Sequence, residues 1–152
     1  MTIVLRRVYE GDKKLIFDWA NDAETRRLSF DTRPIPWPVH EIWFEARLRS
    51  ENTRIYVAQD ELGNDVGPIR FEKEEDHALV GFSIGSSFRG KGMAAPLLAK
   101  GCEAIFAEWN DIAFVLAKVK RDNERSRRAF IKAGFEEVDA GGDTFLYRKF
   151  RR

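Results

Sequence analysis

A glycine-containing turn between a strand-like run and an apolar helical pattern is the feature that most restricts how this chain can fold. The turn reads Phe88-Arg-Gly-Lys-Gly-Met-Ala94, and it separates a strand-like run over residues 80–84 from a helical pattern over residues 95–106. Glycine lets the backbone approach an anion closely, and the first amides of a helix lack intrahelical partners, so they can donate to phosphate oxygens. The order of strand, turn and helix therefore predicts a cradle for a pyrophosphate group.

The spacing within this turn excludes two better-known phosphate-binding loops. The chain has neither Gly-x-x-x-x-Gly-Lys-Ser/Thr nor Gly-x-Gly-x-x-Gly at this point, which excludes a P-loop and a dinucleotide-binding fingerprint. The pattern Arg89-x-x-Gly92-x-Ala94 instead resembles the [Gln/Arg]-x-x-Gly-x-[Gly/Ala] signature of the GNAT superfamily of acyl-CoA-dependent N-acyltransferases. Taken alone, these six residues fit an ordinary surface turn before a helix equally well.

A second segment, farther along the chain, resembles the other conserved segment of that superfamily. It follows a strand-like run over residues 113–119, with Asn123 and Ser126 where a helix begins and Gly134-Phe135 where it ends. Asn is a good helix N-cap and Gly favours a left-handed C-cap, so both residues also have a purely structural explanation. In the superfamily this segment lies beside the pantetheine arm of CoA. With both segments present in this order, the chain is identified as a member of the superfamily.

Composition adds limits to this interpretation. The 152 residues fit one domain over residues 1–152, and a hydrophobic content of 43% with twelve Phe and four Trp excludes a disordered chain. The net charge of +1 argues against a nucleic-acid partner bound through charge alone. No apolar run approaches the roughly 20 residues that span a bilayer, and the N-terminus lacks a signal-peptide pattern, so we expect no membrane partner and a cytoplasmic location. Cys102 is the single cysteine, which excludes an intrachain disulfide and a cysteine-based metal site, and we expect no metal.

The order of predicted elements is that of an α/β (α+β) chain. The resemblance implies the GNAT fold, which is a central mixed, mostly antiparallel sheet of six to seven strands flanked by about four helices. Hydrophobic periodicity and turn residues predict strands over 3–7, 54–59, 66–73, 77–84, 113–120, 136–138 and 144–150. They predict helices over 14–28, 39–49 and 95–106 and after Asn123.

The N-terminal half narrows the resemblance further. The segments Asp18-Trp19-Ala20-Asn21-Asp22, His40-x-x-Trp43-Phe44 and Gly67-Pro68-Ile69-Arg70-Phe71 resemble the GNAT branch that acetylates nucleotide-linked amino sugars. That branch has Arg and Gln where this chain has Ala20 and Pro68, so the acceptor is less well defined than the fold. The resemblance implies acetyl-CoA as co-substrate and transfer of its acetyl group to the primary amine of a small-molecule acceptor.

Direct attack of a neutral amine on the acetyl thioester, which the superfamily implies, requires a base and an oxyanion site. An ammonium group must lose a proton, and Glu72 and His40 are the candidate catalytic bases. Each also has a structural explanation, which is an ion pair with Arg70 for Glu72 and packing or capping in the first helical turn for His40. Backbone amides where the strand ends are expected to stabilise the oxyanion, namely those near Phe82, Ser83 and Ile84.

The departing thiolate also needs a proton. The superfamily usually assigns this to a Tyr four residues before the Gly-Phe pair, but this chain has Phe130 there. A phenyl ring cannot donate a proton, so Ser126, Tyr147 or water does so, or the thiolate leaves unassisted, as the acidity of a thiol allows. The residues expected to bind acetyl-CoA are Phe82, Ser83, Ile84, Arg89, Gly90, Lys91, Gly92, Met93, Ala94, Asn123, Ser126 and Phe130.

Basic residues gather around the second segment, and Arg125, Arg128 and Lys132 are among them. Most are expected to form a solvated helix face, because Glu side chains lie nearby in the sequence, and some are available to the ribose 3′-phosphate of CoA.

Two other functions stay open. One is acetylation of a protein N-terminal α-amine, because ribosomal-protein acetyltransferases share a similar helix and cradle and often lack the Tyr. The other is a non-catalytic module that binds acetyl-CoA. Dimerisation is common in the superfamily, so a homodimer is one arrangement that the resemblance allows, although these residues do not decide it.

Overall fold

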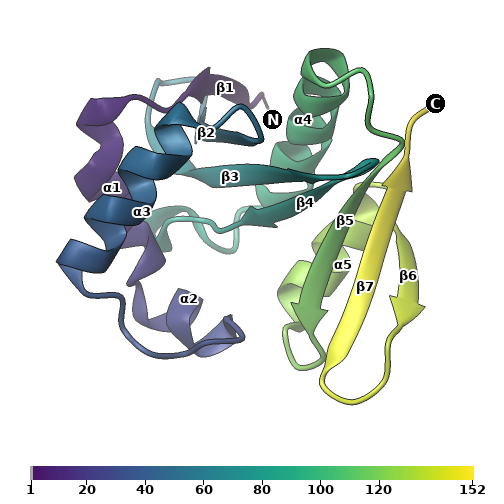
Figure 1. The fold of residues 1–152 in the computed structure, drawn as a ribbon. Helices are drawn as coiled ribbons and strands as arrows, with labels where there is room; N and C mark the ends of the chain where they lie inside the picture. The colour runs from purple at the N-terminus through teal and green to yellow at the C-terminus, as the bar shows by residue number, and fades with distance from the viewer. Residues whose placement is uncertain (1) are drawn as a thin grey trace.

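The computed structural model describes residues 2–152, and these residues fold around one seven-stranded sheet in the order β1-β2-β3-β4-β5-β7-β6 (Figure 1). Neighbouring strands are antiparallel except β4 and β5, which run parallel. The expected α+β class and the mixed, mostly antiparallel sheet are therefore confirmed. The strands are β1 (Val4–Arg7), β2 (Thr53–Gln59), β3 (Asp65–Glu74), β4 (His77–Phe82), β5 (Phe114–Lys120), β6 (Glu136–Asp139) and β7 (Thr144–Phe150).

Helices cover both faces of the sheet. Helices α1 (Lys13–Ala20) and α3 (Trp37–Arg49) lie on one face, and α4 (Ala94–Glu108) and α5 (Glu124–Lys132) lie on the other (Figure 1). The short helix α2 (Ala23–Leu28) lies at the end of the molecule where the two halves of the sheet separate. Two short 3-10 helices, Glu10–Asp12 and Ser86–Phe88, precede α1 and the glycine turn. Within residues 2–152 no helix combines the length and the apolar character that crossing a bilayer requires.

Alternation along β2 divides the core between these two layers. Ile55 and Val57 pack beneath α1 and α3, whereas Tyr56 and Ala58 belong to the larger cluster beneath α4 and α5. Successive strand residues point to opposite faces, so one strand supports both layers. Cys102 lies in the larger cluster, where burial raises the pKa of its thiol to about 12. Its expected role as buried filler is confirmed.

The parallel strands β4 and β5 pair only near their beginnings. Their register ends at Leu79 and Leu116, and beyond this point β4 stays bound to β3 while β5 stays bound to β7 (Figure 1). The amide of Ser83 still donates to the carbonyl of Pro68 on β3, at 3.3 Å. Because alternate residues of a strand direct their backbone groups to opposite sides, Phe82 directs its N–H and C=O toward the side from which β5 has moved away.

The single helix expected over residues 14–28 is wrong, because the structure breaks it after Ala20. The side chain of Asn21 accepts a hydrogen bond from the amide of Ile35 at 2.7 Å and donates to its carbonyl at 3.1 Å. Asp22 then caps α2 by accepting from the amide of Thr25 at 3.1 Å. Such side-chain bonds compete with helical hydrogen bonds, so residues 2–152 contain five α-helices where the sequence indicated about four.

Three other local expectations agree with the structure, whereas the strand expected over 77–84 ends at Phe82. A turn containing Gly63, which has a φ of 81°, joins β2 to β3. Pro38 lies in the first turn of α3. Gly134 has a φ of 92° after α5, and the next amide, that of Phe135, donates to the carbonyl of Phe130 at 3.0 Å. The left-handed C-cap expected at Gly134 is therefore confirmed.

Polar contacts hold α2 against both halves of the sheet. On one side, Arg89 forms an ion pair with the capping carboxylate of Asp22. On the other side, Lys120 at the end of β5 places its Nζ 3.3 Å from the carbonyl oxygens of Arg27 and Ser29. Helix α2 therefore bridges the two strands that separate.

Gly67 on β3 allows the close approach of β4 beside this separation. A Cβ atom at this position would lie 2.2 Å from the carbonyl oxygen of Ser83, which is backbone and cannot rotate away. We expect Gly67→Ala to lower the free energy of unfolding by about 1–3 kcal/mol, measured by urea denaturation. Gly81→Ala is the control, because its Cβ would meet only the Arg70 guanidinium at 3.6 Å, and we expect a change below about 0.5 kcal/mol. Equal stability of Gly67→Ala and the unchanged chain would contradict this packing.

The ion pair between Asp22 and Arg89 makes part of the stability depend on pH. Burial raises the pKa of Asp22, but the Arg89 guanidinium and the amide and hydroxyl of Thr25 lower it by more, so the pKa lies below its ordinary value. The ionised carboxylate therefore stabilises the fold above about pH 4, and this contribution is lost as the pH falls through the lowered pKa.

Asp22→Asn tests this, because Asn is an equally good cap but carries no charge. We expect the free energy of unfolding at neutral pH to fall by about 1 kcal/mol. The difference should shrink below about pH 4, where the carboxyl of the unchanged chain becomes protonated. Asp18→Asn removes an exposed carboxylate that pairs with Lys14 and should change stability by less than about 0.5 kcal/mol. A difference for Asp22→Asn that stays constant across this pH range would contradict the prediction.

Candidate active site

Two cavities lie on either side of the end of β4, with volumes of about 500 Å³ and about 470 Å³. Both are lined by Thr25 in α2 and Ser29 at the end of this helix, and by Phe82 and Ser83 at the end of β4. A smaller cavity of about 220 Å³ lies between β4 and β5 and also contacts Ser29 and Phe82. Groups bound in the two larger cavities would therefore meet at Phe82 and Ser83.

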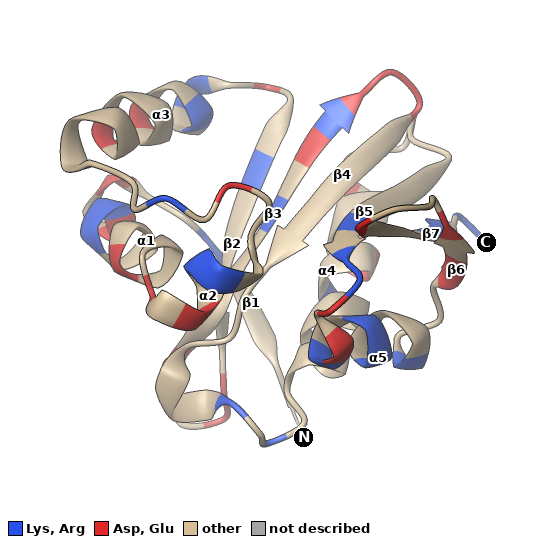
Figure 2. Cartoon of the chain, turned by 90° about the horizontal axis from the view of Figure 1, so that it is seen from below, with Lys and Arg blue, Asp and Glu red and all other residues tan. Residues whose placement is uncertain are grey.

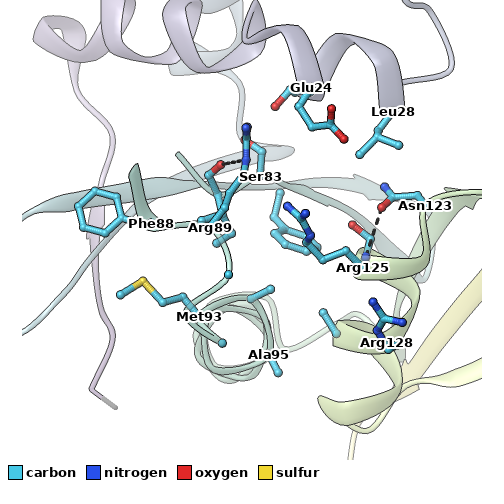
Figure 3. Close-up of a pocket in the computed structure, with 18 of the residues that line it drawn as sticks. Glu24, Leu28, Ser83, Phe88, Arg89, Met93, Ala95, Asn123, Arg125 and Arg128 are labelled. Atoms are coloured by element: carbon cyan, nitrogen blue, oxygen red, sulfur yellow. Dashed lines mark hydrogen bonds between the residues drawn. The ribbon is translucent and has the colours of Figure 1, made fainter. Parts of the chain in front are cut away.

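The first cavity lies between the glycine turn, the start of α4 and α5 (Figure 3). Gly90 and Gly92 have φ values of 75° and 73°, so both occupy the left-handed region that favours glycine. Met93, Ala94 and Ala95 follow at the start of α4 and line the same cavity. The first amides of this helix lack helical partners, so the turn presents hydrogen-bond donors to an anion in the cavity.

The side chain of Arg89 is engaged within the protein. It donates from Nε to the carbonyl of Ile84 at 3.1 Å and forms an ion pair with Asp22. Arg89 also lines the first cavity (Figure 3). It therefore holds the turn against α2. Lys91, also expected at this site, is exposed and lies outside the cavity lining, with its Nζ 5.6 Å from the centre of the Phe88 ring.

Helix α5 forms the opposite wall. Asn123 caps this helix by accepting from the amide of Ser126 at 3.2 Å, and both residues line the first cavity (Figure 3). The expected N-cap is confirmed. Arg125, Arg128 and Lys132 also line this cavity, and Figure 2 shows basic residues along α5. Sequence reasoning assigned most of these cations to a solvated face, but their i, i+3 and i+7 spacing places them on one side of the helix.

Phe130 is a core residue in this structure. Its ring is 2% exposed and stacks on Tyr147 with the ring centroids 5.2 Å apart, and it contacts the small cavity between β4 and β5. The hydroxyl of Tyr147 donates to Glu137 and accepts from Arg127, and burial together with Glu137 raises the pKa of Tyr147 to about 12. Within residues 2–152, Tyr147 lines none of the three cavities, whereas Ser126 lines two.

The second cavity lies on the other side of β4, beneath α3. Its walls include apolar and aromatic residues such as Ile16 and Trp43, and its polar side chains include Arg26, His40 and Arg70. Within the described part of the chain, no Asp or Glu side chain lines it.

His40 lines this second cavity and is 2% exposed. Its ring packs against Phe17 and Phe44, with centroid distances of 5.2 Å and 5.7 Å, so the packing role expected for it is observed. Its Nε2 lies 2.8 Å from the carbonyl oxygen of Lys13. A carbonyl oxygen only accepts hydrogen bonds, so Nε2 carries the proton and Nδ1 is the nitrogen that can accept one.

The structure does not bring Glu72 into any of the three cavities. Its carboxylate accepts from Nε of Arg47 at 2.8 Å, so the ion pair forms with Arg47 instead of the expected Arg70. Glu72 lies four positions along β3 from Pro68, which lines the second cavity. At ~3.3 Å per residue this separation is about 13 Å.

Several solved structures resemble this fold. A spermidine N-acetyltransferase from Vibrio cholerae, in complex with CoA and spermine, is 19% identical over 96% of this chain and 92% of its own, with a TM-score of 0.82. The aminoglycoside acetyltransferase AAC(6')-Ib, with ribostamycin and coenzyme A, is 19% identical over 99% of this chain and 94% of its own, with a TM-score of 0.81. A protein identified provisionally as a phosphinothricin N-acetyltransferase is 26% identical over 97% and 96%, with a TM-score of 0.75.

The sequence itself matches a family model. No curated protein matches the chain at a significant level. The model described as "Acetyltransferase (GNAT) domain" matches residues 2–136, which include the glycine turn, α5 and both large cavities. The chain therefore belongs to the GNAT acetyltransferase family and is an N-acetyltransferase.

Proposed function

We propose that this enzyme transfers the acetyl group of acetyl-CoA to the primary amine of a small acceptor, with a nucleotide-linked amino sugar as the favoured acceptor. The observation that carries the proposal is the meeting of two large cavities at Phe82 and Ser83, one of them lined by a glycine turn whose amides can donate to an anion. Binding sites for two substrates that share one wall allow direct transfer between them. The resemblance of the N-terminal half to the amino-sugar branch supports the choice of acceptor.

Acetyl-CoA is assigned to the first cavity. The backbone of residues 90–94 would bind its pyrophosphate, and Asn123 and Ser126 would lie beside the pantetheine arm. Arg125 and Arg128 would meet the 3′-phosphate, because their guanidinium groups recognise phosphate oxygens well. The thioester would then reach the end of β4.

The transfer step follows from the groups at that point. The amine nitrogen attacks the thioester carbonyl carbon, and negative charge develops on the carbonyl oxygen. This oxygen accepts a hydrogen bond from the Phe82 amide, which stabilises the charge. Collapse of this intermediate breaks the carbon–sulfur bond and releases CoA thiolate, which Ser126 or water protonates. The amine proton passes to Nδ1 of His40, directly or through water, because imidazole is the one side-chain type in the second cavity lining that commonly serves as a general base.

Thiol release from acetyl-CoA, followed colorimetrically, tests this function. UDP-linked 4-amino sugars, peptides with free N-termini and spermidine are supplied separately as acceptors. Release with the amino sugar is the expected result. Release with peptides alone would overturn the proposed acceptor class. CoA binding without thiol release for any acceptor would instead support a non-catalytic acetyl-CoA-binding module.

His40→Gln separates the proposed base from the packing role. The Gln amide can still donate to the Lys13 carbonyl, so the thermal unfolding midpoint should stay close to that of the unchanged enzyme. Loss of the base should lower kcat by about a hundredfold or more and remove the corresponding limb of the pH profile. Ile42→Ala, on the same helix and 72% exposed, should leave kcat unchanged. An unaltered pH profile in His40→Gln would assign proton removal to another group.

A further inference from the structure

The guanidinium of Arg70 faces the second cavity without a partner of its own. Within residues 2–152 it forms no hydrogen bond or ion pair with another residue, although its CZ atom lies 5.3 Å from the centre of the Trp43 ring. The nearest carboxylate on its strand, that of Glu72, accepts a hydrogen bond from Arg47 at 2.8 Å. A planar group with five N–H donors is therefore open toward the cavity.

Burying a charged guanidinium without a hydrogen-bond or ion-pair partner is unfavourable by itself. Burial lowers the pKa of Arg70, and the charge of Arg47 adds to this, although Glu72 acts in the opposite direction. An arginine nevertheless remains charged at neutral pH. Charged donors that are partly removed from water bind carboxylate or phosphate oxygens strongly, often through two parallel hydrogen bonds.

The rest of the second cavity favours the same kind of ligand. No carboxylate lines it within the described residues, so no anionic side chain of the wall would pair with a polycationic acceptor. Its other arginine, Arg26, donates to backbone carbonyls, including those of Ala20 at 2.7 Å and Asp31 at 2.9 Å. Carbonyl oxygens carry no net charge, so the positive charge of Arg26 adds to that of Arg70.

Arg70 lies close to the point of transfer. It is paired across the β3–β4 ladder with Gly81, the residue before Phe82, and a Cβ atom at position 81 would lie 3.6 Å from its Nη2. The absence of a side chain at Gly81 leaves space between the guanidinium and the end of β4. An acidic group held by Arg70 would thus position the rest of the acceptor near Phe82.

We propose that Arg70 binds an anionic group of the acceptor, a carboxylate or a phosphate, and that this enzyme selects amines that carry such a group. The inference rests on the proposed acetyl transfer and makes Arg70 a specificity-determining residue. This selectivity would distinguish the enzyme from acetyltransferases that act on polyamines.

Matched acceptors test the selectivity with the unchanged enzyme. One pair is an α-amino acid and its amide, which differ in the carboxylate, and the other is an amino sugar 1-phosphate and the corresponding methyl glycoside, which differ in the phosphate. We expect the acidic member of at least one pair to have a kcat/KM about tenfold to a hundredfold higher, and the responding pair identifies the anion. Equal or better turnover of uncharged analogues or spermidine would overturn the inference while leaving the transferase function intact. Failure of every amine would instead overturn the function.

Arg70→Gln tests the residue itself. We expect the KM for the acidic acceptor to rise by about tenfold to a hundredfold, with the KM for acetyl-CoA within about twofold of its original value. The preference for the acidic member of the pair should disappear, whereas Arg70→Lys, which keeps the charge but loses the planar fork, should retain part of it. Unchanged thermal unfolding midpoints would show that both variants fold.

Lys73→Gln is the matched control, because Lys73 lies on the same strand, over the ring of Trp109 at 5.0 Å, and is paired with Asp111. This variant removes the same charge from the same strand but lies outside both large cavities. Its acceptor preference should match that of the unchanged enzyme. A preference that persists in Arg70→Gln, or that falls equally in Lys73→Gln, would overturn the assignment to Arg70.

Discussion

The short parallel pairing of β4 with β5 is the constraint on which the site depends. Three residue pairs join these strands, and each strand then continues with a different neighbour. A paired strand would consume the outward N–H and C=O groups of β4, but beyond Leu79 those groups have no strand opposite them. The same separation leaves space on both sides of Phe82, so one short stretch of backbone borders both large cavities.

The polar contacts around this opening have different functions. Arg89 and Asp22 join the glycine turn to α2, and Lys120 joins α2 to β5, so the bridge over the opening is held by charge and hydrogen bonds rather than by a large apolar contact. These contacts leave the backbone of the turn available to a ligand. Arg70, in contrast, has no hydrogen-bond or ion-pair partner among residues 2–152 and faces a cavity. For these two arginines, the presence or absence of a carboxylate partner separates a side chain that supports the fold from one that we propose binds a ligand.

Much of the fold follows from local patterns in the sequence. The glycine turn, the cap at Asn123 and the C-cap at Gly134 depend on the conformational preferences of single residues, and the structure shows each of them. The break after Ala20 was missed, because Leu15, Ile16 and Trp19 continue a helical periodicity that the distant Ile35 backbone interrupts through Asn21. The cavity-facing row on α5 was readable from its spacing, but the same spacing also describes a solvated face.

The sequence by itself determined the order of the strands, the family and the position of the glycine turn, because these depend on residues that are neighbours along the chain. Only the tertiary structure decided which ionisable groups are paired. Arg89 meets Asp22 across 67 positions of sequence, and Arg47 pairs with the carboxylate of Glu72 across 25, which leaves Arg70 open to the second cavity. The physical reason is that an ion pair requires contact within a few ångströms, and that contact is set by how the strands and helices pack.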